Sequence, residues 1–274
     1  MQDKPKQRKM RSEARKRILL PKAEWKRYRK WRKDIEVGPY RPFFETHQLH
    51  STGRKHKFFC PKQQRIVHLM SDGEYKVYQD MIWRPDVVSI DEQYALDIKE
   101  TWKICQELKI HHPYEYQRDI HHIMSTDLIV TLNRSGALVK RAHPVKYEIE
   151  PGANSRTNNK LKVETAFWTA RNIPCEPISA VRVDKNWIKH LDFLSMHYDP
   201  SLSSNELTQF SGLFAKRWAK APKLPLRAIL TQIAQLIGVH QFTAEKVFKN
   251  AALAGLIPLK APVPLVYHKP VLLA

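Results

Sequence analysis

The chain has 274 residues, enough for one large domain or two smaller ones, and its 47 Lys and Arg against 27 Asp and Glu give a formal net charge of +20. Such a charge favours a polyanionic partner, because each phosphate that Lys or Arg neutralises releases condensed counterions. Nucleic acid is the first candidate and an anionic membrane surface the second. With 42% hydrophobic and 27% charged residues, the composition excludes a disordered or fibrous chain.

The sequence also argues against membrane insertion and export. No stretch approaches the roughly 18 uninterrupted apolar residues that span a bilayer. The longest apolar run of the basic N-terminus is residues 18–20, so it lacks the core of a signal peptide, and we expect a cytoplasmic protein. The three cysteines, Cys60, Cys105 and Cys175, form no C-x-x-C pair, which fits a reducing compartment.

Positive charge is concentrated in residues 1–34, a basic arm with fifteen Lys and Arg against four Asp and Glu. Aromatic residues are interleaved with these cations, so the arm can bind phosphates while its rings stack on bases or anchor it to the protein body. A solvated basic helix is the alternative. We expect DNA contacts from Lys26, Arg27, Arg29, Lys30, Arg32 and Lys33.

From residue 43 to about residue 180 the pattern is mixed α/β. The expected elements, in chain order, are a strand at 65–70, a helix at 71–83, a strand at 87–90, strands at 128–132 and 137–145 around a turn at 133–136, and a helix at 158–171. The strand at 87–90 is expected to end at the acidic and polar residues that follow it.

Beyond Asp184 the apolar spacing becomes helical. One helix is expected to end at Gly238, and Thr243 is a candidate N-cap for a second helix that ends near Gly255. A helix, a short turn, a helix and an extended return outline a winged helix, although any small helical domain shares this pattern. We therefore expect two domains, residues 1–183 and residues 184–274.

The predicted hairpin brings Asp127 and Lys146 together at its open end, because the midpoint between them falls beside the Ser135–Gly136 turn. A carboxylate that binds Mg²⁺ and a lysine that orients or activates a water form a phosphodiester hydrolysis site. An aspartate that caps a strand and a solvated lysine would give the same pattern.

Two glutamates are candidates to complete this site. Glu74 lies at the edge of an apolar helix stripe, where a carboxylate needs a partner such as a divalent cation. Ser71 and Glu74 also match an S-x-x-E capping box, which would make Glu74 structural. Glu164 lies on the helix after the hairpin, where an ordinary i, i+4 pair with Lys160 is equally compatible.

The histidines lack the spacing of a structural zinc site. Among His111, His112, His121, His122 and Cys105, no pair has the C-x₂₋₄-C or H-x₃₋₅-H spacing. We expect solvated or hydrogen-bonded histidines, while the acidic residues and the lysine suit a hard cation.

Four segments in order resemble the TnsA family of transposon endonucleases: residues 51–56 (STGRKH), 67–74 (VHLMSDGE), 87–94 (VVSIDEQY) and 124–130 (MSTDLIV). The resemblance implies a restriction-endonuclease-like α/β core, a mixed sheet flanked by helices, before a winged-helix-like C-terminal domain. It also implies a Mg²⁺-dependent endonuclease, with Mn²⁺ able to substitute, that cuts the 5′ ends of a mobile element while a DDE transposase cuts and joins the 3′ ends.

The resemblance assigns catalytic roles to Glu74, Asp127 and Lys146 and a weaker one to Glu164. The family commonly has Gln or an acidic residue two positions before the lysine, where this chain has Pro144. We therefore expect the backbone carbonyl of Val145 to bind the metal together with Glu74 and Asp127.

The partners implied are transposon-end DNA, a TnsB-like DDE transposase and a TnsC-like AAA+ ATPase, with the ATPase docking on residues 184–274 and no membrane. Two alternatives remain. One is a stand-alone restriction-type nuclease or junction resolvase, which would cut DNA by itself. The other is a non-catalytic basic nucleic-acid-binding protein with structural carboxylates.

Overall fold

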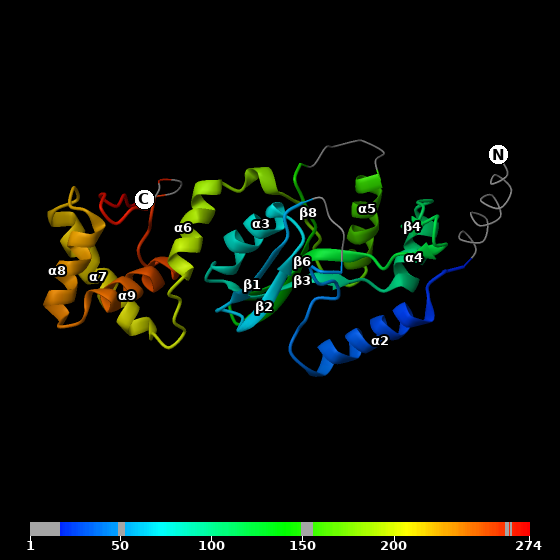
Figure 1. Cartoon of the computed structure of the whole chain (residues 1–274), viewed down its shortest axis with the longest axis horizontal. Coiled ribbons are helices and arrows are strands. Elements are labelled where there is room, and N and C mark those ends of the chain that lie inside the picture. Colours follow the sequence, from blue (N-terminus) through cyan, green and yellow to red (C-terminus); the bar gives the residue numbers. More distant parts are fainter. Residues whose placement is uncertain (1–16, 49–52, 149–155, 261–262, 264) are drawn as a thin grey trace. The chain divides into compact units, whose positions relative to one another are not determined.

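The computed structural model describes residues 17–48, 53–148, 156–260, 263 and 265–274 (Figure 1). Residues 1–16 of the basic arm and residues 51–52 of the first resembling segment lie outside the described residues. The chain forms two compact units. The first comprises the described parts of residues 1–57, 67–74 and 90–179, and the second the described parts of residues 58–66, 75–89 and 180–274.

The helices and strands alternate as expected of an α/β protein. Up to residue 179 they are α2 (Lys22–Val37), β1 (His56–Cys60), β2 (Arg65–Leu69), α3 (Asp72–Ile82), β3 (Val87–Ala95), α4 (Ile98–Glu107), β4 (Tyr114–Glu115), β5 (Ile120–His121), β6 (Ser125–Arg134), β7 (Ala137–His143), β8 (Val145–Lys146), α5 (Arg156–Thr169) and β9 (Ile178–Ser179). They are followed by a 3₁₀ turn η1 (Ala180–Arg182), α6 (Lys185–Ser195), α7 (Ser204–Lys220), α8 (Leu226–Ile237) and α9 (Gln241–Leu253).

The expected mixed α/β pattern is confirmed, with strands β3 and β6 longer than expected. A three-stranded sheet has the order β3-β6-β7. Strand β3 does not stop at Ile90 but continues through the polar residues to Ala95. Glu92 in this extension is fully buried. Its Oε1 accepts a hydrogen bond of 3.0 Å from the backbone N–H of His68, which satisfies the buried carboxylate. Polar residues therefore prolong the strand where a buried partner satisfies them.

The hairpin of β6 and β7 is antiparallel and pairs Arg134 with Ala137 across a two-residue turn. Ser135 and Gly136 in this turn have φ of 52° and 92°. Two successive positive φ values are what a two-residue hairpin loop with the twist of its strands requires. The backbone N–H of Gly136 also donates to the Asn133 side chain at 2.8 Å, which closes the turn.

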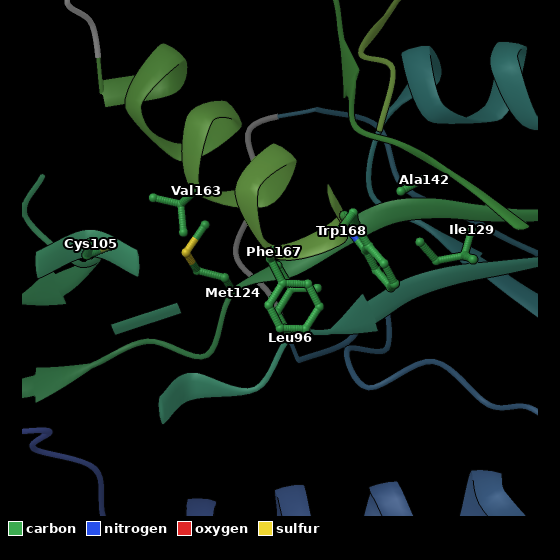
Figure 2. Close-up of a cluster of buried hydrophobic side chains, with 8 residues drawn as sticks. All are labelled: Leu96, Cys105, Met124, Ile129, Ala142, Val163, Phe167 and Trp168. Atoms are coloured by element: carbon green, nitrogen blue, oxygen red, sulfur yellow. The ribbon is translucent and has the colours of Figure 1, made fainter. Parts of the chain in front are cut away.

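An apolar cluster holds the helices of the first unit against this hairpin (Figure 2). It consists of Leu96, Cys105, Met124, Ile129, Ala142, Val163, Phe167 and Trp168. The members come from α4, α5, β6 and β7 and from the segments that lead into β6 and α4, and α4 packs against α5. Burial of these side chains positions α5, which carries Glu164.

A second cluster anchors helix α2. Tyr28 and Trp31 are buried with Phe43, Ile98 and Ile123. The Trp31 ring lies 5.4 Å from the Phe43 ring in an edge arrangement, and its indole N–H donates to the Arg41 carbonyl at 2.9 Å. The aromatic residues of this helix therefore attach it to the protein body, one of the two roles that the sequence allowed for them.

In the second unit, α8 ends at Gly238, which has φ of 69°, as expected. The next helix begins earlier than expected, because His240 and not Thr243 is its N-cap and accepts a hydrogen bond from the Phe242 N–H. After α9, the described residues form isolated bridges such as Leu259 to Leu273 and no regular strand. The winged-helix interpretation and the boundary at residue 184 therefore stay predictions.

None of the helices in the described part of the chain has the length and apolar character needed to cross a bilayer.

The anchoring of α2 can be tested by truncating Trp31, whose side chain is 3% exposed. Trp31→Ala should lower the free energy of unfolding by about 3–5 kcal/mol, because it removes a large buried ring and leaves a cavity. Trp25 on the same helix is only half-buried and serves as the control. Urea unfolding should show a clearly smaller loss for Trp25→Ala, and equal losses for the two variants would contradict the anchoring role.

Candidate active site

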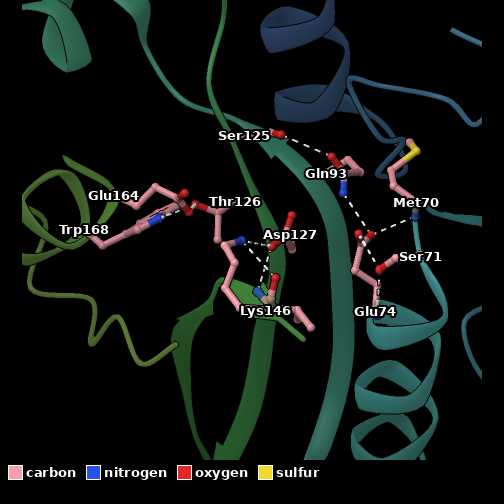
Figure 3. A network of polar contacts seen from close by, with 11 residues as sticks. Met70, Ser71, Glu74, Gln93, Ser125, Thr126, Asp127, Lys146, Glu164 and Trp168 are labelled. Atoms are coloured by element: carbon pink, nitrogen blue, oxygen red, sulfur yellow. Dashed lines mark hydrogen bonds and ion pairs between the residues drawn. The ribbon is translucent and has the colours of Figure 1, made fainter. Parts of the chain in front are cut away.

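Asp127 and Lys146 meet, as expected from the hairpin (Figure 3). Lys146 Nζ donates to Asp127 Oδ2 at 3.1 Å and to the Val145 carbonyl at 2.9 Å. The Asp127 side chain is 18% exposed and the Lys146 side chain 25% exposed, so both are reachable from solvent. The pair is therefore accessible to a substrate, unlike a fully buried ion pair.

The register that brings the pair together differs from the expected one. The ladder between β6 and β7 ends at Leu128 opposite His143, and one further step would place Pro144, not Lys146, opposite Asp127. Proline has no backbone N–H, so it cannot continue the ladder. The chain instead turns into β8, which pairs in parallel with β9, and the Val145 N–H donates to Asp127 Oδ2 at 2.7 Å.

Glu74 is buried at the start of α3 and accepts three hydrogen bonds. Its Oε2 accepts from the Met70 N–H at 2.8 Å and from the Gln93 amide at 3.1 Å, and its Oε1 accepts from the Ser71 hydroxyl at 3.1 Å. The Ser71 hydroxyl also accepts from the Glu74 N–H at 3.1 Å. The structure therefore forms a variant of the expected capping box, in which the backbone donor is Met70 instead of the N-cap residue.

The hydrogen bonds of the capping box do not make the charged form of Glu74 favourable. Burial, followed by the negative charge of Asp127, raises the pKa of Glu74 to about 8. The opposing hydrogen bonds stabilise the carboxylate but do not outweigh these two effects. The capping role and a role at the site beside Asp127 are thus compatible for Glu74.

No sequence motif singled out Gln93, which lies in the resembling segment of residues 87–94 (VVSIDEQY). Its side chain links Glu74 to the Ser125 hydroxyl, which donates to it at 3.1 Å. The Gln93 backbone has φ of 50°, uncommon for a residue with a side chain, near the C-terminal end of β3. A local irregularity of this kind re-aims a side chain, and here Gln93 positions Glu74.

Glu164 on α5 is buried on the other flank of Asp127 (Figure 3). Its Oε2 accepts from the Thr126 hydroxyl at 3.1 Å, and that hydroxyl accepts from the Trp168 indole N–H at 2.8 Å. Within the described residues, Lys160 forms no ion pair with Glu164, so the ordinary i, i+4 pair is absent. Burial and the charge of Asp127 raise the pKa of Glu164 to about 8.

Lys146 is the cation among these acidic residues. Burial by itself lowers the pKa of Lys146, but the charges of Asp127, Glu164 and Glu74 outweigh burial and raise that pKa above its usual value. The side chain is therefore an ammonium group at neutral pH, which donates hydrogen bonds and does not accept a proton.

The donor set fits a hard divalent cation. Glu74, Asp127 and the Val145 carbonyl offer only oxygen atoms, the ligands that Mg²⁺ prefers. The Asp127 charge raises the pKa of both glutamates, so a cation beside it would relieve this repulsion. In the described ranges, no three His, Cys, Asp or Glu side chains converge on one point.

The six cations predicted to contact DNA all lie on α2, and three of them have intramolecular acidic partners. Arg27 pairs with Glu24 at 3.1 Å and also stacks over the Phe43 ring. Lys30 pairs with Asp34 at 2.7 Å, and Arg32 pairs with Glu36 at 3.7 Å. The other three, Lys26, Arg29 and Lys33, are exposed on the helix surface. DNA binding by this helix stays a prediction.

The histidines are used in hydrogen bonds. The ring of His112 lies 3.0 Å from the Thr101 hydroxyl and 3.3 Å from the Pro113 carbonyl, and burial followed by the charge of His121 lowers its pKa to about 4. The His121 ring accepts from the Leu19 N–H at 2.9 Å. The rings of His112 and His121 are thus held by other groups, as expected of hydrogen-bonded histidines.

The raised pKa of Glu164 predicts how stability depends on pH. A carboxyl group whose pKa is higher in the folded state contributes stability that is complete below its ordinary value of 4.5 and is lost as pH rises through about 8. Glu164→Gln is neutral at every pH. In EDTA, it should therefore melt at least about 4 °C above the unmodified protein at pH 9, with little difference at pH 5.

The control is Glu107→Gln, at an exposed glutamate at the end of α4. Its effect on the melting temperature, measured by differential scanning fluorimetry, should be small and similar at the two pH values. If the Glu164→Gln difference failed to grow with pH, Glu164 would not be carrying a buried charge.

Two comparisons identify related proteins. Residues 84–178 match the family model of the TnsA-like endonuclease N-terminal domain, and this segment contains Asp127, Lys146 and Glu164. The chain is also 29% identical over 177 residues to the Tn7 transposition protein TnsA of Escherichia coli, across 64% of this chain. The match spans 62% of that relative, less than two thirds of its length. Both findings agree with the resemblance of the four segments to the TnsA family.

Proposed function

We propose that this protein is a metal-dependent DNA endonuclease that cuts the 5′ ends of a transposon during cut-and-paste transposition. The observation that carries the proposal is the contact of Asp127 with Lys146 beside two buried glutamates, in a segment that matches a TnsA-like endonuclease domain. In this proposal the first unit forms a restriction-endonuclease-like core, in which a β-hairpin presents the carboxylate and the lysine on one edge.

Each residue of the site has a separate role in this proposal. Lys146, as an ammonium group, orients the attacking water and stabilises negative charge on the scissile phosphate. Asp127 holds Lys146 through its Oδ2 atom and fixes the Val145 carbonyl through the neighbouring N–H. Gln93 and Ser71 position the Glu74 carboxylate, and Thr126 positions Glu164.

Mg²⁺ bound by Glu74, Asp127 and the Val145 carbonyl would supply Lewis-acid stabilisation of the attacking and leaving oxygens. Mn²⁺ should substitute, because it also prefers oxygen ligands. Glu164 is buried and bonded to Thr126, so its part is weaker, and it acts on Lys146 through its charge only where it is ionised.

The proposed partners are transposon-end DNA, a TnsB-like DDE transposase that cuts the 3′ ends, and a TnsC-like AAA+ ATPase. The net charge of +20 favours the DNA. The named relative is a transposition protein, which favours the transposase system over a stand-alone nuclease. A stand-alone enzyme would cut plasmid DNA without these partners, and a non-catalytic binding protein would cut none in any metal.

The catalytic assignment is tested on supercoiled plasmid that carries the element ends, with the full chain, its transposase and its ATPase. Asp127→Ala or Lys146→Ala should lower the rate of 5′-strand cleavage at least about 100-fold, because each removes a group that stabilises the transition state. EDTA should stop cleavage, and Mg²⁺ or Mn²⁺ should restore it. DNA affinity, measured by gel shift in EDTA, should stay within about threefold.

Lys140→Ala is the matched control, because Lys140 is an exposed lysine on β7 of the same hairpin. It should cleave at the normal rate. Full cleavage by either Asp127→Ala or Lys146→Ala, under conditions where Lys140→Ala is active, would exclude the proposed site.

The ATPase contact is tested on the full chain, because residues 180–274 form one unit with residues 58–66 and 75–89. In that unit Tyr75 donates to Asp192 at 2.6 Å and Trp187 donates to Asp80 at 3.1 Å, so deletion of the C-terminal part would remove internal partners. Hydrogen–deuterium exchange should show protection of α8 and α9 by the ATPase and not by bare DNA. The opposite ranking would make this region a DNA reader.

A further inference from the structure

A cavity of about 390 Å³ opens in the first unit between the segment after α4 and the first two turns of α5. We call it the tyrosine cleft, defined by Tyr114, Tyr116, Arg156, Asn159 and Lys160. A second hollow of about 580 Å³ shares Tyr114, Tyr116 and four other lining residues with it, so the two adjoin at the tyrosines.

One wall of the cleft is aromatic. The Tyr114 and Tyr116 rings lie 4.9 Å apart in an edge arrangement, and Tyr114 lies 5.1 Å from the His121 ring. Tyr116 is 55% exposed, so its ring remains accessible although its neighbours hold it. An exposed ring with fixed neighbours can stack on any nucleobase, because every base has a π-face.

The lining residues of the cleft also include two cations, Arg156 and Lys160. In the described part of the chain neither Arg156 nor Lys160 has an ion-pair partner. Burial, followed by the charge of Arg156, lowers the pKa of Lys160. The charges of Glu164 and Asp127 oppose this shift without cancelling it. The pKa of His122 is also lowered. Burial is the largest cause, the charge of Glu115 acts in the opposite direction, and the charges of Lys160 and Arg156 lower the pKa further. Positive charges that repel one another in the cleft would be relieved by a bound anion such as phosphate.

The cleft adjoins the candidate active site. Lys160 lies one helical turn before Glu164 on α5, and the charges of Lys146 and Asp127 both act on it. Met124, which lines the cleft, lies three positions before Asp127 at the entry of β6. A DNA strand cut at Asp127 and Lys146 would therefore pass this cleft.

We propose that the tyrosine cleft binds one unpaired nucleotide of the DNA strand next to the cut, with its base stacked on Tyr116 and its phosphate held by Arg156 and Lys160. The proposal takes DNA as the substrate and so rests on the proposed function. The volume is at the lower end of small-molecule sites, which span about 300–1,000 Å³, and suits a nucleotide but not a duplex. Enzymes that act on DNA hold extruded bases in pockets with aromatic walls.

The test measures equilibrium binding of the full chain in EDTA by fluorescence anisotropy. The two probes are a labelled single-stranded 20-mer and the fully paired duplex of that sequence. Tyr116→Ala should weaken single-strand binding about 10-fold, because a stacked base is lost, while duplex binding changes less than about twofold. Tyr116→Phe, which keeps the ring, should bind as the unmodified protein does. Lys160→Gln should reduce the salt dependence of single-strand binding by about one phosphate contact.

Matched controls separate this site from general DNA affinity. Phe59 is also 55% exposed, and Phe59→Ala should leave single-strand binding unchanged. Lys103→Gln, at an exposed lysine on α4, should leave the salt dependence unchanged. Equal effects of Tyr116→Ala on single strand and duplex, no effect on either, or a loss that Tyr116→Phe does not rescue would each overturn the proposal.

Failure of the cleft and failure of the proposed function give different results. An inactive Asp127→Ala together with normal single-strand binding by Tyr116→Ala would exclude the nucleotide site in the cleft and support the endonuclease assignment. A fully active Asp127→Ala together with a 10-fold loss for Tyr116→Ala would keep the cleft as a nucleotide site and remove the catalytic assignment.

Discussion

The hydrogen bond from the Val145 N–H to Asp127 Oδ2, at 2.7 Å, determines the geometry of the candidate site. Pro144 ends the β6–β7 ladder because it has no N–H to donate, and a side chain takes over the pairing one residue later. The same oxygen then accepts from Lys146, so one carboxylate closes the hairpin and holds the lysine of the candidate site.

The buried glutamates explain why the site is suited to a cation. Glu74 and Glu164 come from two helices on either flank of Asp127, and burial together with the Asp127 charge raises the pKa of each to about 8. Lys146 compensates only part of this negative charge. Structural roles account for the hydrogen bonds of both glutamates, but like charges placed this close destabilise a fold unless a ligand offsets them. The site therefore combines local capping with stored electrostatic repulsion that a metal would relieve.

The positive charge of the chain has more than one use. On α2, Arg27 and Lys30 have acidic partners, and Trp31 attaches the helix to the first unit, so part of the basic arm is structural. In the tyrosine cleft, Lys160 and Arg156 repel each other beside the site, and neither forms an ion pair within 4 Å among the described residues. A charge count over the sequence cannot separate these cases, because both kinds of cation contribute equally to it.

The sequence by itself determined the α/β pattern, the hairpin around Ser135 and Gly136, and the identity of Asp127, Lys146, Glu74 and Glu164 as candidates. These depend on neighbours along the chain: alternation in a strand, turn residues, a capping motif and a family resemblance. Only the tertiary structure decided that β3 continues to Ala95, that Gln93 positions Glu74, and that a cleft of tyrosines adjoins the site. Strand ends, burial and charge coupling depend on which distant elements pack together, and local sequence does not encode that packing.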